Sequence, residues 1–379
     1  MFEQAISAMA SVVVDPYLLG LIFATTILGV IIGVLPGLGA TTGAALLLPF
    51  TLTMDPVHAI AVLATIYVSA TFAGSITAIL INTPGTSAAA ATTFDGYPLA
   101  QKGEAGRALG IAVISSTVGG IFSVLILCFA APLLARVAYE FRSPEYFALT
   151  VFGLSMLASI SAGGAVKNLI GGIFGVWLST IGAERVTGIE RFMFGNYELY
   201  EGLHFVPIFI GLFAISELLV QSKTVDKIIK TVSMKAVKLP TLEDYKKIWK
   251  TILRSCGIGT FIGVLPAEGA TVASMIGYSE ARRWSKNKKE FGKGSIEGIA
   301  GAEAANNAAT GGAMVPTMVL GIPGSGTTAI ILVGLMVHGL RPGVYLFTEQ
   351  VEKVYQIFGS MFVANVMFML MGLYAAKLF

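Results

Sequence analysis

The sequence predicts an all-α polytopic membrane protein in which two inverted repeats each contain a re-entrant helical hairpin. Three observations predict this fold class. The 379-residue chain is 55% hydrophobic and 12% charged, with a mean hydropathy of +0.78, whereas soluble domains carry about 25% charged residues. Apolar stretches of roughly 17–25 residues, long enough to span a bilayer, recur along almost the whole chain. One broken apolar segment occurs twice in nearly the same form.

The internal repeat begins in the first apolar stretch. The segment IGVLPGLGAT at 32–41 returns as IGVLPAEGAT at 262–271, with eight of ten positions identical and an offset of 230. A second pair follows in the same order at an offset of 239, INTPGTS at 81–87 and LGIPGSG at 320–326. Similarity in fixed order at long separation indicates an internal repeat, which is the usual architecture of secondary transporters.

The first repeat is expected to cover residues 1–221. Residues 17–53 are predicted to form a hairpin that turns at LPGLGAT and returns to its own side, because its second arm is short for an independent span. About five crossings follow, judged from apolar length. They are expected at 57–80, 106–135, 145–162, 166–183 and 203–221. Because this number of crossings is odd, the second copy enters from the opposite face, and the repeat is predicted to be inverted.

The charge distribution predicts the orientation. The first 101 residues contain no Lys or Arg, and since these residues collect on the cytoplasmic side, we expect the N-terminus to face outward. Residues 222–254 hold eight Lys and Arg254 against three acids, and are predicted to be a basic cytoplasmic loop. A second basic segment lies at 282–293. The stretch between them, 255–281, is therefore predicted to be a re-entrant hairpin with both ends on the cytoplasmic side.

The second repeat, 255–379, is predicted to be incomplete. Its hairpin is followed by about two crossings, near 298–320 and 351–376, and by a broken segment near 321–340. Counterparts of the last three crossings of the first repeat are missing. We therefore expect either a C-terminally shortened version of a longer protein or two halves that are unequal.

The polar breaks are the predicted solute site. Irregular backbone within a membrane survives only inside protein or against a water-filled cavity, because unpaired polar groups are costly in hydrocarbon. Glycine allows close backbone approach, and the free amides at the start of the following helix attract anions. The alternative is that each break is a proline kink with glycine for helix packing. The residues predicted to bind the solute are Pro36, Gly37, Gly39, Thr41, Thr42, Asn82, Thr83, Pro84, Gly85, Thr86, Pro266, Gly269, Thr271, Pro323, Gly324, Ser325, Thr327 and Thr328.

Residues 300–312, AGAEAANNAATGG, form a third feature. Glu303, Asn306 and Asn307 are spaced at i, i+3 and i+4, so they share one helical face. Ionisable groups inside a membrane are costly and are functional candidates by default. Asn306 and Asn307, with Glu303 in support, are therefore the candidate site for Na⁺ or a proton. Interhelical hydrogen bonding is the alternative.

No pattern in the sequence indicates an enzyme. The three His residues are scattered, and no metal-ligand spacing, nucleophile elbow, Walker loop or dinucleotide fingerprint is present. We therefore expect no enzymatic activity, no cofactor and no transport powered by ATP within this chain. The breaks suit a secondary transporter that works by alternating access; a gated channel and a non-transporting or truncated scaffold subunit are the alternatives.

Three stretches of the chain are specific enough to compare with a known family. They are GVLPGLGATTGAALLLPF, GSITAILINTPGT with FDGYPLAQKGEAGRALGIA, and EFGKGSIEGIAGAEAANNAATGGAMVPTMVLGIPGSGTTA. In these, and from about residue 17 to the C-terminus, the chain resembles the large membrane subunit of the tripartite tricarboxylate transporters. The resemblance implies that the functional segments fall on residues 33–42, 82–98 and 303–328.

The same resemblance implies the cellular setting. It implies a multi-pass protein of the cytoplasmic (inner) membrane of a bacterium or archaeon, which imports a tricarboxylate or dicarboxylate by symport with Na⁺ or H⁺. The implied partners are a small integral membrane subunit, an extracytoplasmic solute-binding protein, the carboxylate solute and the lipid bilayer, with no nucleic acid. For the oligomeric state, a homodimer is one alternative. The sequence names neither the solute nor the coupling ion.

Overall fold

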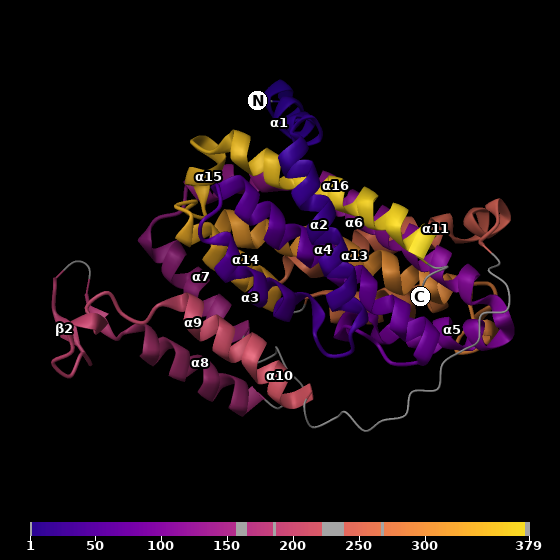
Figure 1. The fold of residues 1–379 in the computed structure, drawn as a ribbon, viewed down its shortest axis with the longest axis horizontal. Helices are drawn as coiled ribbons and strands as arrows, with labels where there is room; N and C mark the ends of the chain where they lie inside the picture. The colour runs from indigo at the N-terminus through magenta and orange to yellow at the C-terminus, as the bar shows by residue number, and fades with distance from the viewer. Residues whose placement is uncertain (1, 157–164, 185–186, 222–238, 267–268, 376–379) are drawn as a thin grey trace.

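The computed structural model describes residues 2–156, 165–184, 187–221, 239–266 and 269–375. These residues form a helical bundle with a lateral arm at residues 143–221 (Figure 1). The arm also contains the antiparallel strand pair β1 (Gly182–Ala183) and β2 (Glu190–Arg191). The described helices are α1 (Phe2–Val14), α2 (Pro16–Val34), α3 (Gly39–Thr51), α4 (Pro56–Ile81), α5 (Ala90–Leu99), α6 (Ala105–Tyr139), α7 (Ser143–Met156), α8 (Ala165–Ser179), α9 (Phe205–Phe209), α10 (Ser216–Gln221), α11 (Leu242–Val264), α12 (Gly269–Trp284), α13 (Ile296–Leu320), α14 (Gly326–Val337), α15 (Val344–Thr348) and α16 (Val351–Ala375).

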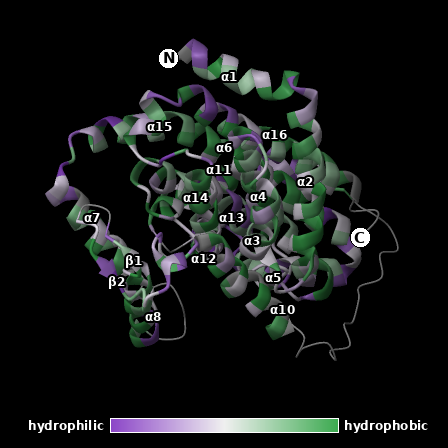
Figure 2. Cartoon of the chain, turned by 60° about the vertical axis from the view of Figure 1, so that its left-hand side comes forward, coloured by the Kyte–Doolittle hydropathy of each residue, from purple (hydrophilic) through white to green (hydrophobic). Residues whose placement is uncertain are grey.

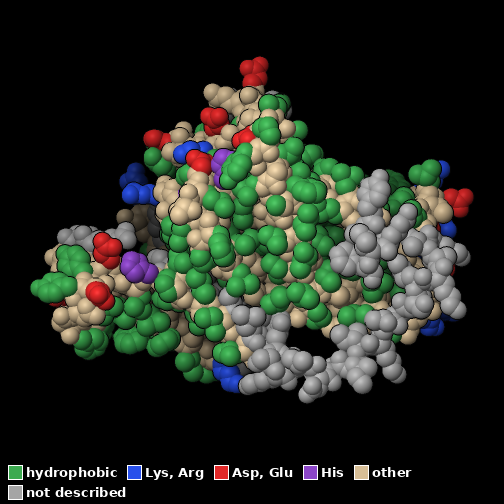
Figure 3. Space-filling model, viewed as in Figure 1, with side chains coloured by type: hydrophobic (Ala, Val, Ile, Leu, Met, Phe, Trp, Pro, Cys, Tyr) green, Lys and Arg blue, Asp and Glu red, His purple; other side chains and the backbone are tan. Residues whose placement is uncertain are grey.

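Apolar surface covers much of the bundle. Large hydrophobic side chains such as Phe23, Ile27 and Phe129 are exposed, and Figure 3 shows hydrophobic side chains over the centre of the face and charged ones near its edges. Figure 2 shows hydrophobic residues along most of α2. Within the described chain, four helical segments are long and apolar enough to cross a membrane, namely Pro16–Val34, Pro56–Ile81, Ser87–Tyr139 and Val351–Leu373. The predicted all-α membrane fold is confirmed, and the chain is a multi-pass membrane protein.

Side-chain caps fix where the main helices begin. Asp15 accepts hydrogen bonds from the first amides of α2, and Asp55 does the same for α4. A proline follows each aspartate and fits the first helical turn. Thr241 and Asp244 form a reciprocal capping box at the start of α11, and Ser295 caps α13. These caps determine the residues at which α2, α4, α11 and α13 begin.

In the first half, α2 and α4 run parallel and α3 runs back. Gly29 of α2 lies against Ser69 of α4, and Gly33 lies further along against Ala70. A Cβ added to Gly33 would come within 2.4 Å of the Ala70 carbonyl oxygen, so only glycine fits there. The N-terminal ends of α2 and α4 also meet, since the ring centroids of Tyr17 and His58 are 5.1 Å apart. Because α3 ends where α4 begins, the α2–α3 segment turns at its tip and returns to the end of the bundle from which it started.

The second half repeats this arrangement. Gly259 and Gly263 of α11 lie against Ala305 and Ala309 of α13, so these two helices also run parallel. A Cβ on Gly263 would come within 2.5 Å of the Ala309 carbonyl oxygen. Gly263 lies 230 positions after Gly33, and Ala309 lies 239 positions after Ala70. These are the offsets of the two sequence repeats. α12 returns along α13 in the opposite direction and ends near its start, where Ser285 donates a hydrogen bond to Glu297.

The two halves meet where α4 and α13 cross. The side-chain amides of Asn306 and Asn307 donate to the carbonyl oxygens of Thr71 (3.5 Å) and Val68 (3.4 Å). Since the α4 number falls as the α13 number rises, the helices are antiparallel. Val68 and Asn307 are themselves 239 positions apart, so equivalent residues meet at the crossing. We call the two ends of the bundle the α4 end and the α13 end, after the helix that starts there.

Each helix that follows a break reaches the opposite half. The carboxylate of Asp95 in α5 accepts hydrogen bonds from the amides of Gly294 and Ser295, both 2.8 Å, at the α13 end. His338, at the C-terminal end of α14, contacts the carbonyl oxygen of Thr51, 2.9 Å away, at the α4 end. The halves are thus joined at both ends of the bundle as well as at the crossing.

The helix bounds agree with some of the expected spans and differ from others. α4, α6, α13 and α16 coincide with the spans expected at 57–80, 106–135, 298–320 and 351–376, with residue 376 outside the described residues. The basic loop expected at 222–254 is too long, because α11 already begins at Leu242 through its capping box. For the same reason the hairpin expected at 255–281 is longer, and it runs to Trp284. Residues 222–238 lie outside the described residues.

The lateral arm departs most from expectation. α8 ends at Ser179, short of the span expected at 166–183, because Gly182 adopts a φ of 116° and residues 182–183 pair as a strand. The span expected at 203–221 contains a π turn at Ile210–Ile215 between α9 and α10. Of the span expected at 145–162, α7 covers residues up to Met156, and residues 157–164 lie outside the described residues.

Candidate functional site

The breaks after α4 and α13 have the same backbone geometry. α4 ends at Asn82, which has a φ of 55°, and both Asn82 and Thr83 donate their amides to the Thr77 carbonyl oxygen. α13 ends at Gly321, with a φ of 68°, and Gly321 and Ile322 donate to Pro316 in the same way. Asparagine and glycine are the residues that most readily adopt this left-handed cap. The cap redirects the chain into the Pro-Gly segment that follows each helix.

The glycine after each proline allows the backbone to come close. The Gly85 amide donates to the carbonyl oxygen of Gly74, 3.1 Å away, and a Cβ on Gly85 would lie 2.0 Å from the Gly33 carbonyl oxygen. The Gly324 amide donates to the Thr317 hydroxyl, and a Cβ there would lie 2.7 Å from the Cα of Ala313. Both breaks are therefore pressed into the protein rather than left in lipid, as buried irregular backbone requires.

The hairpin tips contact these breaks, each reaching the break of the other half. The Thr41 and Thr327 hydroxyls share a hydrogen bond of 2.9 Å, and those of Ser87 and Thr271 share one of 3.0 Å. Thr41 and Thr271 are equivalent residues of the sequence repeat. We call these two contacts the hydroxyl bridges. They bring together four segments that lie far apart in the sequence, and with them most of the predicted solute-binding residues.

The first hairpin tip also touches the break of its own half. The Gly37 amide donates to the Gly85 carbonyl oxygen, 3.2 Å away. Gly37 and Gly39 have φ values of 89° and 48°, which glycine adopts without strain. At the second tip, Pro266 is buried and Gly269 lies against Ser325, while residues 267 and 268 lie outside the described residues.

Helix N-termini converge at this cluster of breaks. α3, α12 and α14 begin at Gly39, Gly269 and Gly326, and the turn that leads into α5 begins at Ser87. The first amides of a helix carry partial positive charge and lack partners within the helix. No Lys or Arg occurs in the break segments 32–43, 81–90, 262–273 or 320–329. The cluster can therefore attract an anion through backbone dipoles alone, as helix N-termini do for phosphate and carboxylate groups.

Not every predicted hydroxyl is free to meet a solute. Ser325 and Thr328 form the capping box of α14, and Ser325 also donates to the hydroxyl of Tyr67, 3.2 Å away. Thr42 is buried among the helices. By contrast, the hydroxyl oxygen of Thr86 is buried and has no hydrogen-bond partner among the described residues. Thr86 is thus the predicted residue with the most evident capacity for a further bond.

Asn306 and Asn307 present two unpaired carbonyl oxygens at the helix crossing. Both residues are fully buried, and neither Oδ1 atom has a partner among the described residues. The orientation of each amide is set, because its nitrogen faces a backbone carbonyl that can only accept. Buried polar atoms without partners are rare, and an unseen water or ion is a common reason. Neutral oxygens of this kind can coordinate Na⁺.

Glu303 lies elsewhere on the same helix. It is fully buried, and its two oxygens accept hydrogen bonds from the hydroxyls of Thr92 in α5 and of Ser116 in α6, the latter at 2.7 Å. Its carboxylate therefore contacts α5 and α6, and it also interacts with the side chain of Asn306. The asparagine nitrogens reach α4 as well, so the face predicted from sequence spacing touches three neighbouring helices.

Sequence reasoning missed Tyr67, Ser87, Thr92 and Ser116. Tyr67 precedes Asn306 by 239 positions, so alignment of the repeats could have singled it out. Ser87 lies next to the predicted Thr86 but was not included. Thr92 lies within the segment 82–98 that the family resemblance implied, but Ser116 carries no signal in the sequence, and the contact of both with Glu303 spans about 200 residues. That contact is visible only in the fold.

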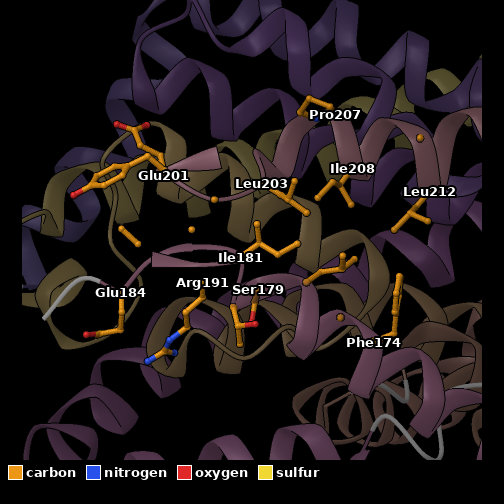
Figure 4. Close-up of a pocket in the computed structure, with 18 of the residues that line it drawn as sticks. Phe174, Ser179, Ile181, Glu184, Arg191, Glu201, Leu203, Pro207, Ile208 and Leu212 are labelled. Atoms are coloured by element: carbon orange, nitrogen blue, oxygen red, sulfur yellow. The ribbon is translucent and has the colours of Figure 1, made fainter. Parts of the chain in front are cut away.

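The cavity in the lateral arm is a separate feature. It has a volume of about 1550 Å³ and lies between α8, the strand pair and α9. Figure 4 shows apolar side chains such as Phe174, Ile208 and Leu212 along one part of it, with Glu184 and Arg191 at the other. None of the residues predicted for the solute or the ion lines this cavity. The convergence of breaks in the bundle is therefore the better candidate site.

Comparison with known proteins gives a consistent family assignment. Residues 19–379 match the family described as "Tripartite tricarboxylate transporter TctA family". The chain is 41% identical over 353 residues to an Agrobacterium vitis protein named "Uncharacterized 52.8 kDa protein in TAR-I ttuC' 3'region", which covers 93% of this chain and 70% of that protein. It is 39% identical over 115 residues to the A. vitis "Uncharacterized protein in TAR-II ttuC' 3'region", covering 30% of this chain and 48% of that one. No solved structure matches the chain.

Proposed function

Because this chain belongs to the tripartite tricarboxylate transporter TctA family, we propose that it imports an organic carboxylate across the cytoplasmic membrane, driven by a Na⁺ or H⁺ gradient. The family is a transporter family and not an enzymatic one, and its large subunit works with a small membrane subunit and a solute-binding protein. For this chain, the proposed solute is a tricarboxylate or dicarboxylate, delivered by an extracytoplasmic solute-binding protein.

The observation that carries the proposal is the pair of hydroxyl bridges. They join the helix N-termini of both halves around a region that lacks Lys and Arg. A site built from backbone dipoles and hydroxyls holds an anion without a fixed countercharge, so the solute can also be released. The solute is proposed to bind between the two bridges, with Thr86 supplying one hydrogen bond.

We also propose that the two halves form an inverted repeat with re-entrant hairpins. The support is that the hairpins start from opposite ends of the bundle and that equivalent residues meet at the antiparallel α4–α13 crossing. Alternating access then follows from rocking of one half against the other around the fixed site.

The α13 end is proposed to face the cytoplasm. Basic residues gather there: Lys102 donates to the carbonyl oxygen of Lys293, and Arg107 pairs with Asp244 at the start of α11. Asp15 and Asp55 lie at the α4 end, with Arg341 in the loop after α14. Since Lys and Arg collect on the cytoplasmic side, the α4 end faces outward, where a solute-binding protein would deliver the solute.

The coupling ion is proposed to bind at Asn306 and Asn307, with Glu303 supplying nearby negative charge. The support is the two unpaired, buried Oδ1 atoms at the contact between the halves. An ion there touches the surface along which the halves move, so its binding would bias one arrangement over the other.

Uptake by matched threonine variants tests the solute site. Thr41→Val and Thr271→Val each remove one hydroxyl bridge, and each is expected to lower uptake of labelled citrate or succinate about tenfold, as loss of roughly 1.4 kcal/mol would. The control is Thr26→Val, because the Thr26 hydroxyl is buried and, among the described residues, bonds only to Ile22 of its own helix. Uptake would be measured with the partner subunits present and protein levels matched. Unchanged uptake in both bridge variants would show that the solute does not bind between the hydroxyl bridges.

The same assay separates the alternatives. Accumulation against a concentration gradient excludes a gated channel, which only equilibrates its solute. A non-transporting scaffold subunit would give no ion-driven uptake even with an unsubstituted site. Ion-driven uptake by the unsubstituted chain that falls in Thr41→Val would therefore exclude the scaffold alternative.

A further inference from the structure

His338 makes an unusual pair of contacts at the α4 end. Its ring nitrogen Nδ1 lies 2.8 Å from the carbonyl oxygen of Gly334, and Nε2 lies 2.9 Å from the carbonyl oxygen of Thr51. Gly334 is in the last turn of α14, and Thr51 is the last residue of α3. One imidazole ring therefore bridges the C-terminal ends of two helices from different halves.

The chemistry of these contacts requires a particular protonation state. A carbonyl oxygen can only accept a hydrogen bond, and neutral imidazole has a single N–H. Both contacts are satisfied together only when both ring nitrogens carry a proton, which is the cationic form. Helix C-termini also carry partial negative charge and favour a cation. Two such ends meet at this ring.

The described elements that pack against α14 carry few other charged groups. α3 and α9, which pack near α14, contain no titratable side chain, and α14 contains none before His338. α4 contributes Asp55 and His58 in its first turn and Tyr67 further along. α13 contributes Glu297 and Glu303 from its N-terminal half, towards the other end of the bundle. Arg341 follows in the loop after α14.

The bridge completes a two-ended connection. At their N-terminal ends, α3 and α14 are joined by the hydroxyl bridge between Thr41 and Thr327. At their C-terminal ends they are joined by His338 and Thr51. In the related pair, α12 and α5, the position equivalent to His338 is Leu99, which is buried against Gly294 and has no side-chain donor. The bridge at the α4 end therefore has no counterpart at the equivalent position of the α13 end.

We propose that His338 is a proton-binding site that locks α14 to α3 when it is protonated. Neutral imidazole can keep one of the two bonds, so loss of the proton frees one helix end from the other. Histidine is the side chain that changes charge between about pH 5 and 8. The lock therefore closes when the ring gains its second proton and loosens when the ring loses it. The proposed function places the α4 end on the outer face of the membrane, so under that proposal the proton comes from outside the cell. The lock itself does not rest on the proposed function.

The test measures the distance between the two helix ends. Spin labels are placed at Leu52→Cys and Val337→Cys, both exposed positions, in the full chain with Cys128 and Cys256 replaced by Ala, reconstituted in nanodiscs. We expect a short, narrow distance distribution at pH 5.5 and a longer, broader one at pH 8. His338→Gln does not titrate and is expected to give the same distribution at both pH values. His204→Gln, at an exposed histidine, is expected to keep the pH response.

Two results would overturn the proposal: distributions of the unsubstituted His338 protein that coincide at both pH values, or a pH response that survives in His338→Gln. A ring-nitrogen NMR titration of the ¹⁵N-histidine-labelled chain provides a second measurement, in which His338 must show two protonated nitrogens in acid. Neither measurement depends on solute uptake. A failure of the transport proposal would therefore leave this result unaffected, and the reverse also holds.

Discussion

The middle of α4 and the middle of α13 occupy equivalent places in the two halves but differ in chemistry. Tyr67 and Val68 in α4 stand where α13 has Asn306 and Asn307. Both helices are almost completely buried, and each packs against a parallel helix through two glycines. Yet only α13 presents unpaired amide oxygens at the crossing. The two halves thus share their packing and their breaks, whereas the candidate ion site belongs to one of them.

This difference separates what the repeat preserves from what it does not. The glycines of α2 and α11 must occur in both halves, because at these positions the backbone of each helix lies directly against the backbone of its parallel neighbour, α4 or α13. The ion site has no such constraint, and α4 supplies to it only backbone carbonyls that accept from the asparagine nitrogens. We expect a single coupling site in each chain, placed on the surface along which the halves meet.

The largest effect is expected from the shared packing. Gly33→Ala and Gly263→Ala each place a methyl group within 2.4–2.5 Å of a backbone carbonyl oxygen of the facing helix. Overpacking of this kind costs about 1–3 kcal/mol or more. We expect both variants to lower the thermal midpoint in detergent by similar amounts and to abolish uptake. The controls are Gly20→Ala in α2 and Gly257→Ala in α11, where nothing lies within 4 Å.

The outcome bears directly on the equivalence of the halves. If Gly33→Ala were tolerated while Gly263→Ala unfolded the protein, the two helix pairs would not be packed alike, and the shared geometry of the halves would be lost as an argument. Helix propensity alone favours alanine over glycine, so a lowered midpoint in the Gly20→Ala or Gly257→Ala control would show that something other than close approach to the facing helix decides the result.

A smaller and more specific effect is expected at the crossing. Asn306→Ala and Asn307→Ala each remove one unpaired oxygen and one bond to α4. We expect the Na⁺ or H⁺ concentration needed for half-maximal uptake to rise about tenfold, as loss of roughly 1.4 kcal/mol of ion binding would require, with the solute affinity at saturating ion less affected. The equivalent change on the other helix, Val68→Ala, is expected to leave the ion dependence unaltered.

The readout is initial uptake rate against ion concentration. An ion dependence identical to that of the unsubstituted chain in both asparagine variants would move the coupling site elsewhere. Glu303 would then be the next residue to examine, since it accepts hydrogen bonds from α5 and α6 beside the crossing.

The sequence predicted the breaks well because their cause is local. Pro-Gly pairs inside apolar stretches cannot continue a helix, and their repetition revealed that two segments fold alike. It predicted the polar face of α13 for the same reason, from spacing alone. It could not predict which breaks meet, since the Thr41–Thr327 and Ser87–Thr271 bridges depend on how the halves dock. The early start of α11 was also missed, because positive charge was taken as the mark of a loop.

The smallest effect is expected at Tyr67, which stands in α4 where α13 has Asn306. Its hydroxyl accepts a hydrogen bond from Ser325, the residue that caps α14 at the cluster of breaks. Tyr67→Phe keeps the buried ring but removes this bond, which is worth about 0.5–1.5 kcal/mol. Since Ser325 still caps α14 through Thr328, the fold should hold. We expect a two- to tenfold weaker apparent solute affinity, with the ion dependence unchanged.

That pattern would place Tyr67 on the solute side of the crossing and Asn306 on the ion side, although the two positions are equivalent in the repeat. The measurement is solute affinity from uptake at saturating ion, beside ion affinity at saturating solute. Should Tyr67→Phe shift the ion affinity instead, the tyrosine and the asparagines would act on one shared site. The division between a duplicated solute frame and a single ion site would then have to be abandoned.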